Sequence, residues 1–180
     1  MPAELFATPL AGVWEIHSHS FSDHRGSFLN AFRLHETSFQ QAWGERTIHQ
    51  VNISRTESAG VVRGLHFQKQ PFSEAKLVRC LRGCVWDVAV DLRVDSPSYG
   101  AWHSIKLNST NGNSLLIPEG CAHGFQVIES GSELLYLHSA PWVPDSETGV
   151  RWDDPYLAVK WPLPVTGMSS RDLNLPFLNF

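Results

Sequence analysis

Two stretches of the sequence decide its fold: Gly60-Val-Val-Arg-Gly-Leu-His66-Phe-Gln68 and Gly112-Asn-Ser-Leu-Leu-Ile-Pro118-Glu-Gly120-Cys-Ala-His123-Gly-Phe125. Each stretch is a short apolar run that glycine residues interrupt, and each contains one histidine. Runs of this kind between glycine turn signals favour short strands over helices. The two stretches therefore predict two strands, each of which carries an imidazole side chain.

Both stretches resemble the two sequence motifs of the cupin superfamily of small β-barrels. The second stretch is a close match, with Gly112, five residues, Pro118-x-Gly120, two residues and then His123. The first stretch departs at one position, because metal-binding cupins carry His-x-His where this chain has His66-Phe67-Gln68. The resemblance implies an all-β fold, a cupin-like jelly-roll β-barrel.

Gln68 bears on whether such a barrel would hold a metal ion. Metal-binding cupins use two histidines and a carboxylate from the first motif and a histidine from the second. The neutral amide of Gln68 is a poor ligand for a transition metal beside imidazoles. Glu74 follows His66 at a longer spacing than the carboxylate of those proteins. We therefore expect no metal and no other cofactor, which leaves the His66 imidazole unligated.

An unligated His66 has two interpretations. An unperturbed imidazole titrates near pH ~6.5, so it can act as a base at neutral pH. Alternatively, His66 is a hydrogen-bonded histidine of the core. Gly64 on the same strand face leaves room for a ligand, and the basic residues Arg63 and Lys76 flank it. These neighbours favour the base.

The rest of the chain predicts a single all-β domain over 1–180. A chain of 180 residues can bury a sufficient core in one domain. Many short alternating segments between turns indicate a sandwich or a barrel. The expected strands are 13–17, 28–32, 77–81, 84–92, 102–107, 114–117, 124–128 and 134–138. Strands 77–81 and 84–92 are expected to form a hairpin about the turn Arg82-Gly83. Residues 35–43 are expected to form a short helix, and the residues after Asp145 an irregular tail.

Composition limits the partners of the chain. The net charge is −4 and no run is rich in lysine or arginine, so we expect no nucleic-acid partner. No stretch approaches the ~18–20 apolar residues of a membrane span, so we expect no membrane partner and a cytoplasmic protein. Three cysteines are too few and odd in number for a disulfide framework, and Cys80 and Cys84 are expected to pack as small hydrophobic side chains.

Further fragments resemble one family within this superfamily, the dTDP-4-dehydrorhamnose 3,5-epimerases. They are Asp23-His-Arg25-Gly26, Gln50-Val-Asn52, Ala75-Lys-Leu-Val-Arg79, Trp86-Asp-Val-Ala-Val-Asp-Leu-Arg93, Trp152-Asp-Asp-Pro155 and Ser170-Arg-Asp172. Together with the two stretches quoted first, they cover nearly the whole chain. The resemblance implies an isomerase that inverts C3, C5 or both in a dTDP-linked 4-keto-6-deoxy sugar. It also implies a homodimer that forms by exchange of strands.

The same resemblance implies four catalytic residues. His66 is similar to the base of the family, Asp172 to the carboxylate that pairs with it, and Tyr136 to the proton donor on the opposite side of the sugar. Lys76 is similar to the group near the ketone. Each has a structural alternative: Tyr136 as a core aromatic, Lys76 as a solvated strand residue, and Asp172 as a residue that holds the tail.

The resemblance also implies a set of substrate-binding residues. Arg63 is similar to a phosphate ligand, Arg25 to one contributed across the dimer, and Phe28 to an aromatic side chain near the nucleotide base. Substrate contacts are further implied for Gln50, Asn52, His123, Glu147 and Arg171. Arg25 follows an aspartate and can instead form a local ion pair. Arg63 and His66 are three residues apart, so a regular strand would place their side chains on opposite faces. A site that contains both requires a bulge at Gly64 or a cavity shared between subunits.

Two positions depart from the pattern of the family. Trp142 stands where many members carry tyrosine, and Asn30 stands where a glutamate is common. Both are counted among the substrate-binding residues, and both leave the exact sugar open. A mono-epimerase or a ketoisomerase of a related nucleotide sugar is therefore an alternative. A metal-dependent cupin enzyme and a non-catalytic nucleotide-sugar-binding protein are two others.

Overall fold

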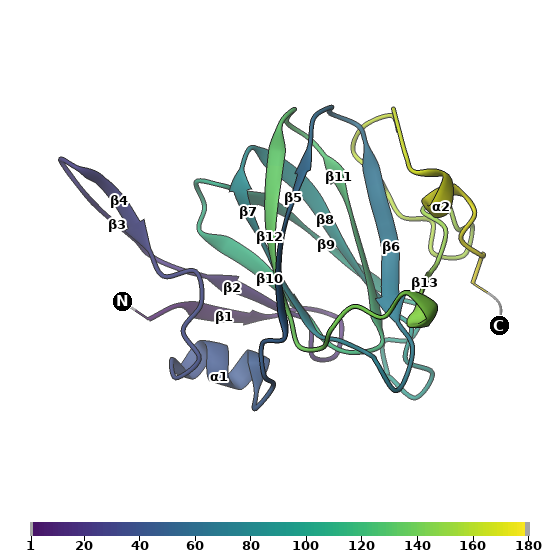
Figure 1. Cartoon of the computed structure of the whole chain (residues 1–180), viewed down its shortest axis with the longest axis horizontal. Coiled ribbons are helices and arrows are strands. Elements are labelled where there is room, and N and C mark those ends of the chain that lie inside the picture. The colour runs from purple at the N-terminus through teal and green to yellow at the C-terminus, as the bar shows by residue number, and fades with distance from the viewer. Residues whose placement is uncertain (1, 179–180) are drawn as a thin grey trace.

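The computed structural model describes residues 2–178 and consists mainly of antiparallel strands in two sheets (Figure 1). The six-stranded sheet contains, in spatial order, β1 (Glu4–Ala7), β2 (Trp14–His17), β10 (Asn113–Ile117), β7 (Lys76–Arg82), β12 (Ser132–His138) and β5 (Gln50–Thr56). The five-stranded sheet contains β13 (Glu147–Gly149), β6 (Val62–Gln68), β11 (Cys121–Val127), β8 (Cys84–Asp91) and β9 (Trp102–Asn108). The remaining elements are a hairpin of β3 (Ser20–Asp23) and β4 (Gly26–Leu29), helices α1 (Thr37–Trp43) and α2 (Ser170–Leu173), and a 3₁₀ turn, η1 (Pro144–Ser146).

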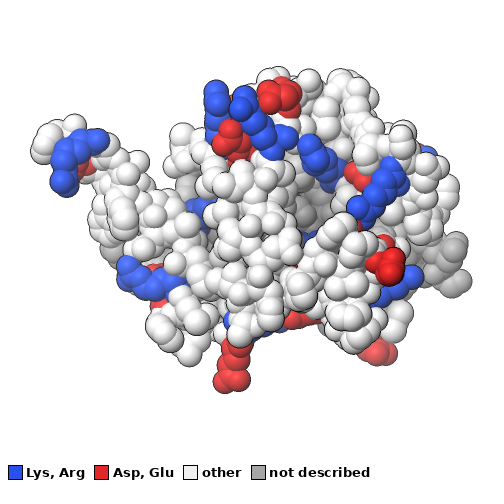
Figure 2. Space-filling model, in the orientation of Figure 1, with Lys and Arg blue, Asp and Glu red and all other residues white. Residues whose placement is uncertain are grey.

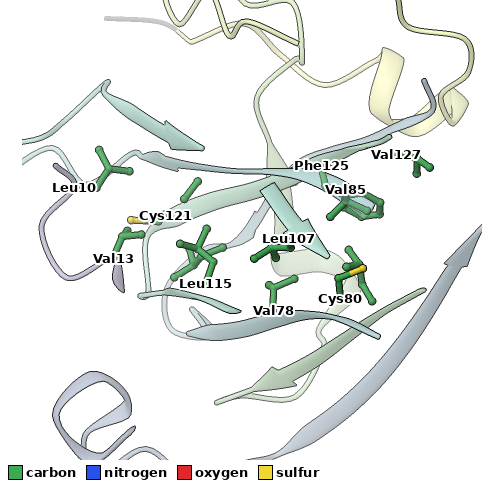
Figure 3. Packing of buried hydrophobic residues seen from close by; sticks show 13 residues of the cluster. Leu10, Val13, Val78, Cys80, Val85, Leu107, Leu115, Cys121, Phe125 and Val127 are labelled. Carbon is green, nitrogen blue, oxygen red and sulfur yellow. The ribbon is translucent and has the colours of Figure 1, made fainter. Parts of the chain in front are cut away.

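The main hydrophobic core lies between the two sheets (Figure 3). Val78 of β7 and Leu115 of β10 meet Val85 of β8 and Phe125 of β11, and all four are buried. Alternate residues of each strand point into this layer, as expected for strands with one buried face. The all-β jelly-roll barrel expected from the sequence is confirmed.

Two smaller clusters cover the outer faces of the sheets. Helix α1 packs Phe39 and Trp43 against the six-stranded sheet, in agreement with the helix predicted over 35–43. The segment after β13 covers the five-stranded sheet with Val150, Leu157 and Trp161. The predicted irregular tail is therefore an ordered cover, and it carries α2 to the edge of β6 (Figure 1). Among residues 2–178, no helix is long and apolar enough to cross a membrane.

The hairpin predicted from 77–81 and 84–92 is wrong, although both strands exist. β7 pairs with β10 and β12 in one sheet, whereas β8 pairs with β9 and β11 in the other. Both strands bury side chains on both faces, so their apolar pattern does not distinguish a hairpin from strands of two facing sheets. The chain crosses between the sheets at Gly83, whose φ is +73° and whose added Cβ would lie 2.5 Å from Ser132 Oγ.

The hairpin β3–β4, which we call the arm, projects from the body of the protein (Figures 1 and 2). Its Phe21 and Phe28 side chains are 52% and 63% exposed. The strand predicted over 28–32 ends at Leu29, because the chain turns back to the body there. At the root, Arg79 donates hydrogen bonds to Ser18 Oγ and the Ala31 carbonyl, on either side of the arm. Burial lowers the pKa of Arg79 to about 10.

Candidate active site

A cavity of about 910 Å³ opens between the two sheets and is closed on one side by the segment around α2. It brings together all of the predicted catalytic residues and most of the predicted substrate-binding residues. These are His66, Lys76, Tyr136 and Asp172, with Gln50, Asn52, Arg63, His123, Trp142, Glu147 and Arg171. Because strands of both sheets supply them, functional groups face the cavity from opposite walls.

His66 and Asp172 form a hydrogen-bonded pair on the β6 wall. His66 Nε2 lies 2.8 Å from Asp172 Oδ1, and the Gly64 amide donates to Asp172 Oδ2 at 3.1 Å. The side chain of Asp172 is 5% exposed. Burial by itself raises the pKa of Asp172, but the hydrogen bonds and charge of His66, with the Gly64 amide, outweigh it and lower that pKa. The carboxylate is therefore ionised at neutral pH and fixes the His66 ring.

A bulge in β6 resolves the opposite parity of Arg63 and His66. His123 of β11 pairs with His66 and Phe125 pairs with Arg63, so three steps along β6 match two steps along β11. The extra residue lies at Gly64-Leu65, where Gly64 has a φ of +114° and its added Cβ would meet the Gly124 backbone at 2.5 Å. Arg63 and His66 therefore both line the cavity of one chain. Arg63 is also held by Thr56, whose Oγ1 accepts from Nε at 3.0 Å.

Tyr136 lies on β12, in the sheet opposite His66. Its hydroxyl is 3.1 Å from Ser54 Oγ, and its ring lies edge-on to His123, with the centroids 6.0 Å apart. Tyr136 also packs against the main core, so the structural alternative describes part of its environment. Burial raises the pKa of Tyr136, since the phenolate would be desolvated. The phenol therefore holds its proton at neutral pH and can donate it.

Lys76 is buried in the cavity wall rather than solvated. It is 8% exposed, and its ammonium lies 3.0 Å from Glu74 Oε1. The other oxygen of Glu74 lies 2.9 Å from His138 Nδ1. The pKa of Glu74 is raised by burial and lowered more by His138 and Lys76, so the net shift is downward. One ionised carboxylate thus holds two cavity side chains.

His123 has a buried carboxylate partner as well. Its Nε2 lies 2.8 Å from Asp87 Oδ1, and Asp87 is fully buried. Burial raises the pKa of Asp87, and the hydrogen bond from His123 only partly compensates. Sequence reasoning gave no role to Asp87 or His138, and it considered Glu74 only as a metal ligand. The alternation of inward and outward side chains along β8 and β12 could have indicated Asp87 and His138, since it places both on inward faces.

Gln68 does not point at the cavity as a ligand would. Its amide nitrogen donates to the Phe72 and Pro141 carbonyls at 3.0 and 3.1 Å, and its oxygen accepts from the Val143 amide at 2.6 Å. Within residues 2–178, no group of three or more His, Cys, Asp or Glu side chains could hold a metal ion. The residues present do not fit the metal site of metal-binding cupins. Gln68 instead holds the segment that carries Trp142.

Trp142, Glu147 and Arg171 form a polar cluster at the cavity mouth. The Trp142 indole donates to Glu147 Oε2 at 2.5 Å, and Arg171 Nη2 lies 2.6 Å from the same oxygen. The Trp142 amide donates to Gln50 Oε1 at 3.0 Å. Trp142 is therefore anchored by its indole N–H.

Three predicted binding residues lie away from this cavity, on or beside the arm. Arg25 and Phe28 border a second, smaller hollow in the arm itself, and Asn30 follows the end of β4. Arg25 forms the local ion pair considered above, with Nη2 at 2.7 Å from Asp23 Oδ2. The structure of one chain thus separates these residues from His66 and Tyr136.

The fold and the cavity together define a class of protein: a cupin-type jelly-roll protein with a hydrogen-bonded His–carboxylate pair and a phenol on opposite walls of its cavity. Comparison of the sequence with known protein families identifies the family. The family described as dTDP-4-dehydrorhamnose 3,5-epimerase matches residues 7–179. This chain belongs to that family.

Individual relatives agree with this assignment. A dTDP-4-dehydrorhamnose 3,5-epimerase of Sinorhizobium fredii is 41% identical over 94% of this chain and 86% of its own. A dTDP-4-dehydrorhamnose 3-epimerase of Streptomyces niveus is 42% identical over 91% of this chain and 78% of its own. The crystal structure of NovW, a 4-keto-6-deoxy sugar epimerase of Streptomyces spheroides, has a TM-score of 0.92 at 38% identity, covering 98% of this chain and 88% of that one.

Proposed function

We propose that this chain, as a single domain in the cytoplasm, epimerises a dTDP-linked 4-keto-6-deoxy sugar at C3, C5 or both by general acid–base catalysis. The observation that carries the proposal is the His66–Asp172 pair at 2.8 Å on one wall of a cavity whose opposite wall presents Tyr136. The names of the relatives support the substrate class, since they describe epimerases of dTDP-4-dehydrorhamnose and of 4-keto-6-deoxy sugars.

The chemistry requires groups on two faces of the sugar. A ketone at C4 acidifies the C–H bonds at C3 and C5, because loss of either proton gives an enolate. Inversion removes the proton from one face and returns a proton to the other. A base and an acid on opposite walls meet this requirement, and each such step is typically worth about 10²–10⁴-fold in rate.

His66 supplies the base in this proposal. A carboxylate only accepts hydrogen bonds, so the Nε2 that faces Asp172 carries the proton and the lone pair lies on Nδ1. Asp172 stabilises the imidazolium that forms when His66 takes the substrate proton. The Lys76 ammonium stabilises negative charge on the C4 oxygen, and the Tyr136 phenol returns a proton from the other side.

Binding of the nucleotide involves a second chain in the same proposal. Arg63 and Arg171 line the cavity and suit a diphosphate, which Arg guanidinium groups bind well. The arm is exposed, carries the aromatic side chains of Phe21 and Phe28, and has Arg25 at its tip, so it is suited to reach into the cavity of a partner. We propose a strand-exchanged homodimer in which Arg25, Phe28 and Asn30 complete the nucleotide site of the other subunit.

Solvent deuterium exchange tests the proposed reaction. The protein is incubated with dTDP-4-keto-6-deoxyglucose in heavy water, and NMR follows the protons at C3 and C5. We expect exchange at one or both carbons in the wild type and its loss in His66→Ala. His103→Ala is the matched control, because His103 pairs with Glu15 at 2.8 Å outside the cavity. Absence of exchange at both carbons in the wild type would contradict the proposal.

A mono-epimerase is the second candidate. Trp142 replaces a phenol at the cavity mouth, and one of the relatives is named a 3-epimerase at 42% identity. Exchange at C3 or C5 alone identifies this outcome in the same experiment. Isomerised products would indicate a ketoisomerase, a dependence on added metal would indicate a metal enzyme, and dTDP binding without exchange would indicate a binding protein.

A further inference from the structure

The pair of Glu74 and His138 has no part in the proposed proton transfer, yet it is built into the cavity wall. Both side chains line the cavity, and Glu74 is 7% exposed. Glu74 lies between His138 Nδ1 at 2.9 Å and Lys76 Nζ at 3.0 Å. His138 also lies against Tyr136, with the ring centroids 5.9 Å apart and the planes inclined by 28°. This second pair therefore sits beside the groups assigned to the ketone and the acid.

The contact with Glu74 determines which nitrogen of His138 carries the proton. An ionised carboxylate accepts hydrogen bonds and donates none, so Nδ1 must be the protonated nitrogen. With the proton on Nδ1, a neutral ring has its lone pair on Nε2. Asn52 Nδ2 lies 3.4 Å from Nε2, a long contact that a better donor can displace.

Lys76 offers hydrogen-bond donors where Nε2 of His138 offers an acceptor. An ammonium has three N–H donors and no acceptor. Glu74 takes one of these donors, and the His66 carbonyl lies 3.5 Å away near a second. Lys76 and His138 are directly opposite residues of β7 and β12, so their side chains leave the sheet as neighbours. Of the titratable side chains of the cavity, Glu74 contacts Lys76 directly and His138 lies opposite it on β12.

We propose that His138 is a specificity-determining residue whose Nε2 accepts a hydrogen bond from a sugar hydroxyl next to the ketone, and that Glu74 is its positioning residue. A donor and an acceptor side by side match a C4 ketone and the hydroxyl on C3. The wall thus selects 4-keto sugars that retain a 3-hydroxyl over their 3-deoxy counterparts. This inference rests on the proposed function for the identity of the sugar, whereas the protonation of His138 does not depend on it.

NMR of the unliganded protein tests the protonation of His138. Long-range ¹H–¹⁵N spectra distinguish the two neutral tautomers of each histidine ring, and His138→Asn identifies the signals of His138 by their absence. We expect the neutral tautomer with its proton on Nδ1. A ring protonated on Nε2 would overturn the proposal. Because no substrate is needed, this readout stands even if the wild type shows no exchange.

Binding of two sugars tests the selectivity. Dissociation constants are measured in a His66→Ala background, which prevents turnover, for dTDP-4-keto-6-deoxyglucose and its 3-deoxy analogue. We expect the 3-hydroxy sugar to bind about 10-fold more tightly, as one buried hydrogen bond provides. His138→Asn should abolish this preference, since an amide can still donate to Glu74 but has no acceptor at the Nε2 position.

His103→Asn in the same background is the matched control. It makes the same change in a histidine that pairs with Glu15 outside the cavity, and it should leave the preference unchanged. A preference that survives His138→Asn, or one that His103→Asn also removes, would overturn the inference. If the proposed function itself is wrong, the result differs, because the wild type then shows no deuterium exchange at C3 or C5.

Discussion

At the scale of one residue, Asp172 holds the ring of His66, the base in the proposed reaction. Its carboxylate contacts the His66 ring and the Gly64 amide, and its backbone amide donates a hydrogen bond to Ser169 Oγ. These contacts fix both the orientation and the tautomer of His66. Asp172→Asn should keep the packing but lower the exchange rate by about 10²–10⁴-fold. Steady-state exchange rates at neutral pH check this effect, and a variant with wild-type rates would contradict this role.

The same residue contributes to stability with a defined sign. The pKa of Asp172 is lowered in the folded protein. Its contribution is therefore fully present above about pH 4, the value for an unfolded chain, and is lost as the pH falls through the lowered pKa. The difference in Tm between the wild type and Asp172→Asn should accordingly be largest at neutral pH and shrink in acid.

Sequence reasoning predicted the residues that line the cavity better than it predicted their partners. His66, Tyr136, Lys76 and Asp172 all line one cavity, as the family resemblance implied. The partners Glu74 and Asp87 were missed because each pairs with a histidine far along the chain, His138 and His123 respectively. Local spacing says nothing about such pairs, which become neighbours only when strands align in register.

At the scale of the element, two features shape β6: a bulge at Gly64 and the hydrogen bonds of Gln68 at its end. The bulge at Gly64 turns Arg63 and His66 to the same cavity. The sequence left two explanations for their shared site, a bulge or a cavity between subunits, and the bulge is the one observed. The end of the strand is fixed by Gln68, whose amide holds the segment from Pro141 to Val143. The sequence indicated that Gln68 is a poor metal ligand, but not what the amide binds instead.

Gln68→Leu tests this tether. Leucine fills similar space but removes the hydrogen bonds to the Pro141 and Phe72 carbonyls and from the Val143 amide, each of which typically contributes about 0.5–1.5 kcal/mol. We expect a lower Tm and a higher KM, because Trp142 loses its fixed position. Gln126→Leu is the matched control, since Gln126 is also buried and holds the Leu163 backbone away from the cavity. Kinetics and thermal unfolding of both variants decide the matter: equal effects on KM would contradict a specific role of Gln68.

The hairpin predicted about Gly83 shows the limit at this scale. Residues 77–81 and 84–92 were correctly identified as strands, and the short turn between them is real. A tight turn usually joins paired strands, yet here it joins two sheets, because Val78 and Val85 both face the central core. Pairing depends on which strands compete for each edge, and this competition involves the whole chain.

At the scale of the whole molecule, the arm separates part of the predicted nucleotide site from the cavity. In the proposed dimer, Arg25 of one chain serves the cavity of the other. Arg25→Ala should lower kcat/KM about 10–100-fold, the usual effect of losing a hydrogen bond to a charged group. His66→Ala should be inactive. A mixture refolded from both variants should regain activity that neither has alone, because one site of each mixed dimer is intact.

A second mixture provides the control for this experiment. His66→Ala and Asp172→Asn change two residues that meet within one chain, so their mixture should regain nothing. Exchange rates of the separate and mixed proteins are the measurement, and a mixture of Arg25→Ala with His66→Ala that only averages its components would contradict the shared site. The sequence implied this dimer only through its family, since no pattern in one chain states where its arm docks.

In the proposed dimer, the exposed arm would also make activity depend on protein concentration. Phe21 and Phe28 expose 52% and 63% of their surface in the isolated chain, and burying them in a partner would favour association. By mass action, dilution would separate the protomers and leave every cavity without its arm. Specific activity would then fall on dilution and Tm would rise with protein concentration, so that a complete site is a property of the solution as well as of the chain.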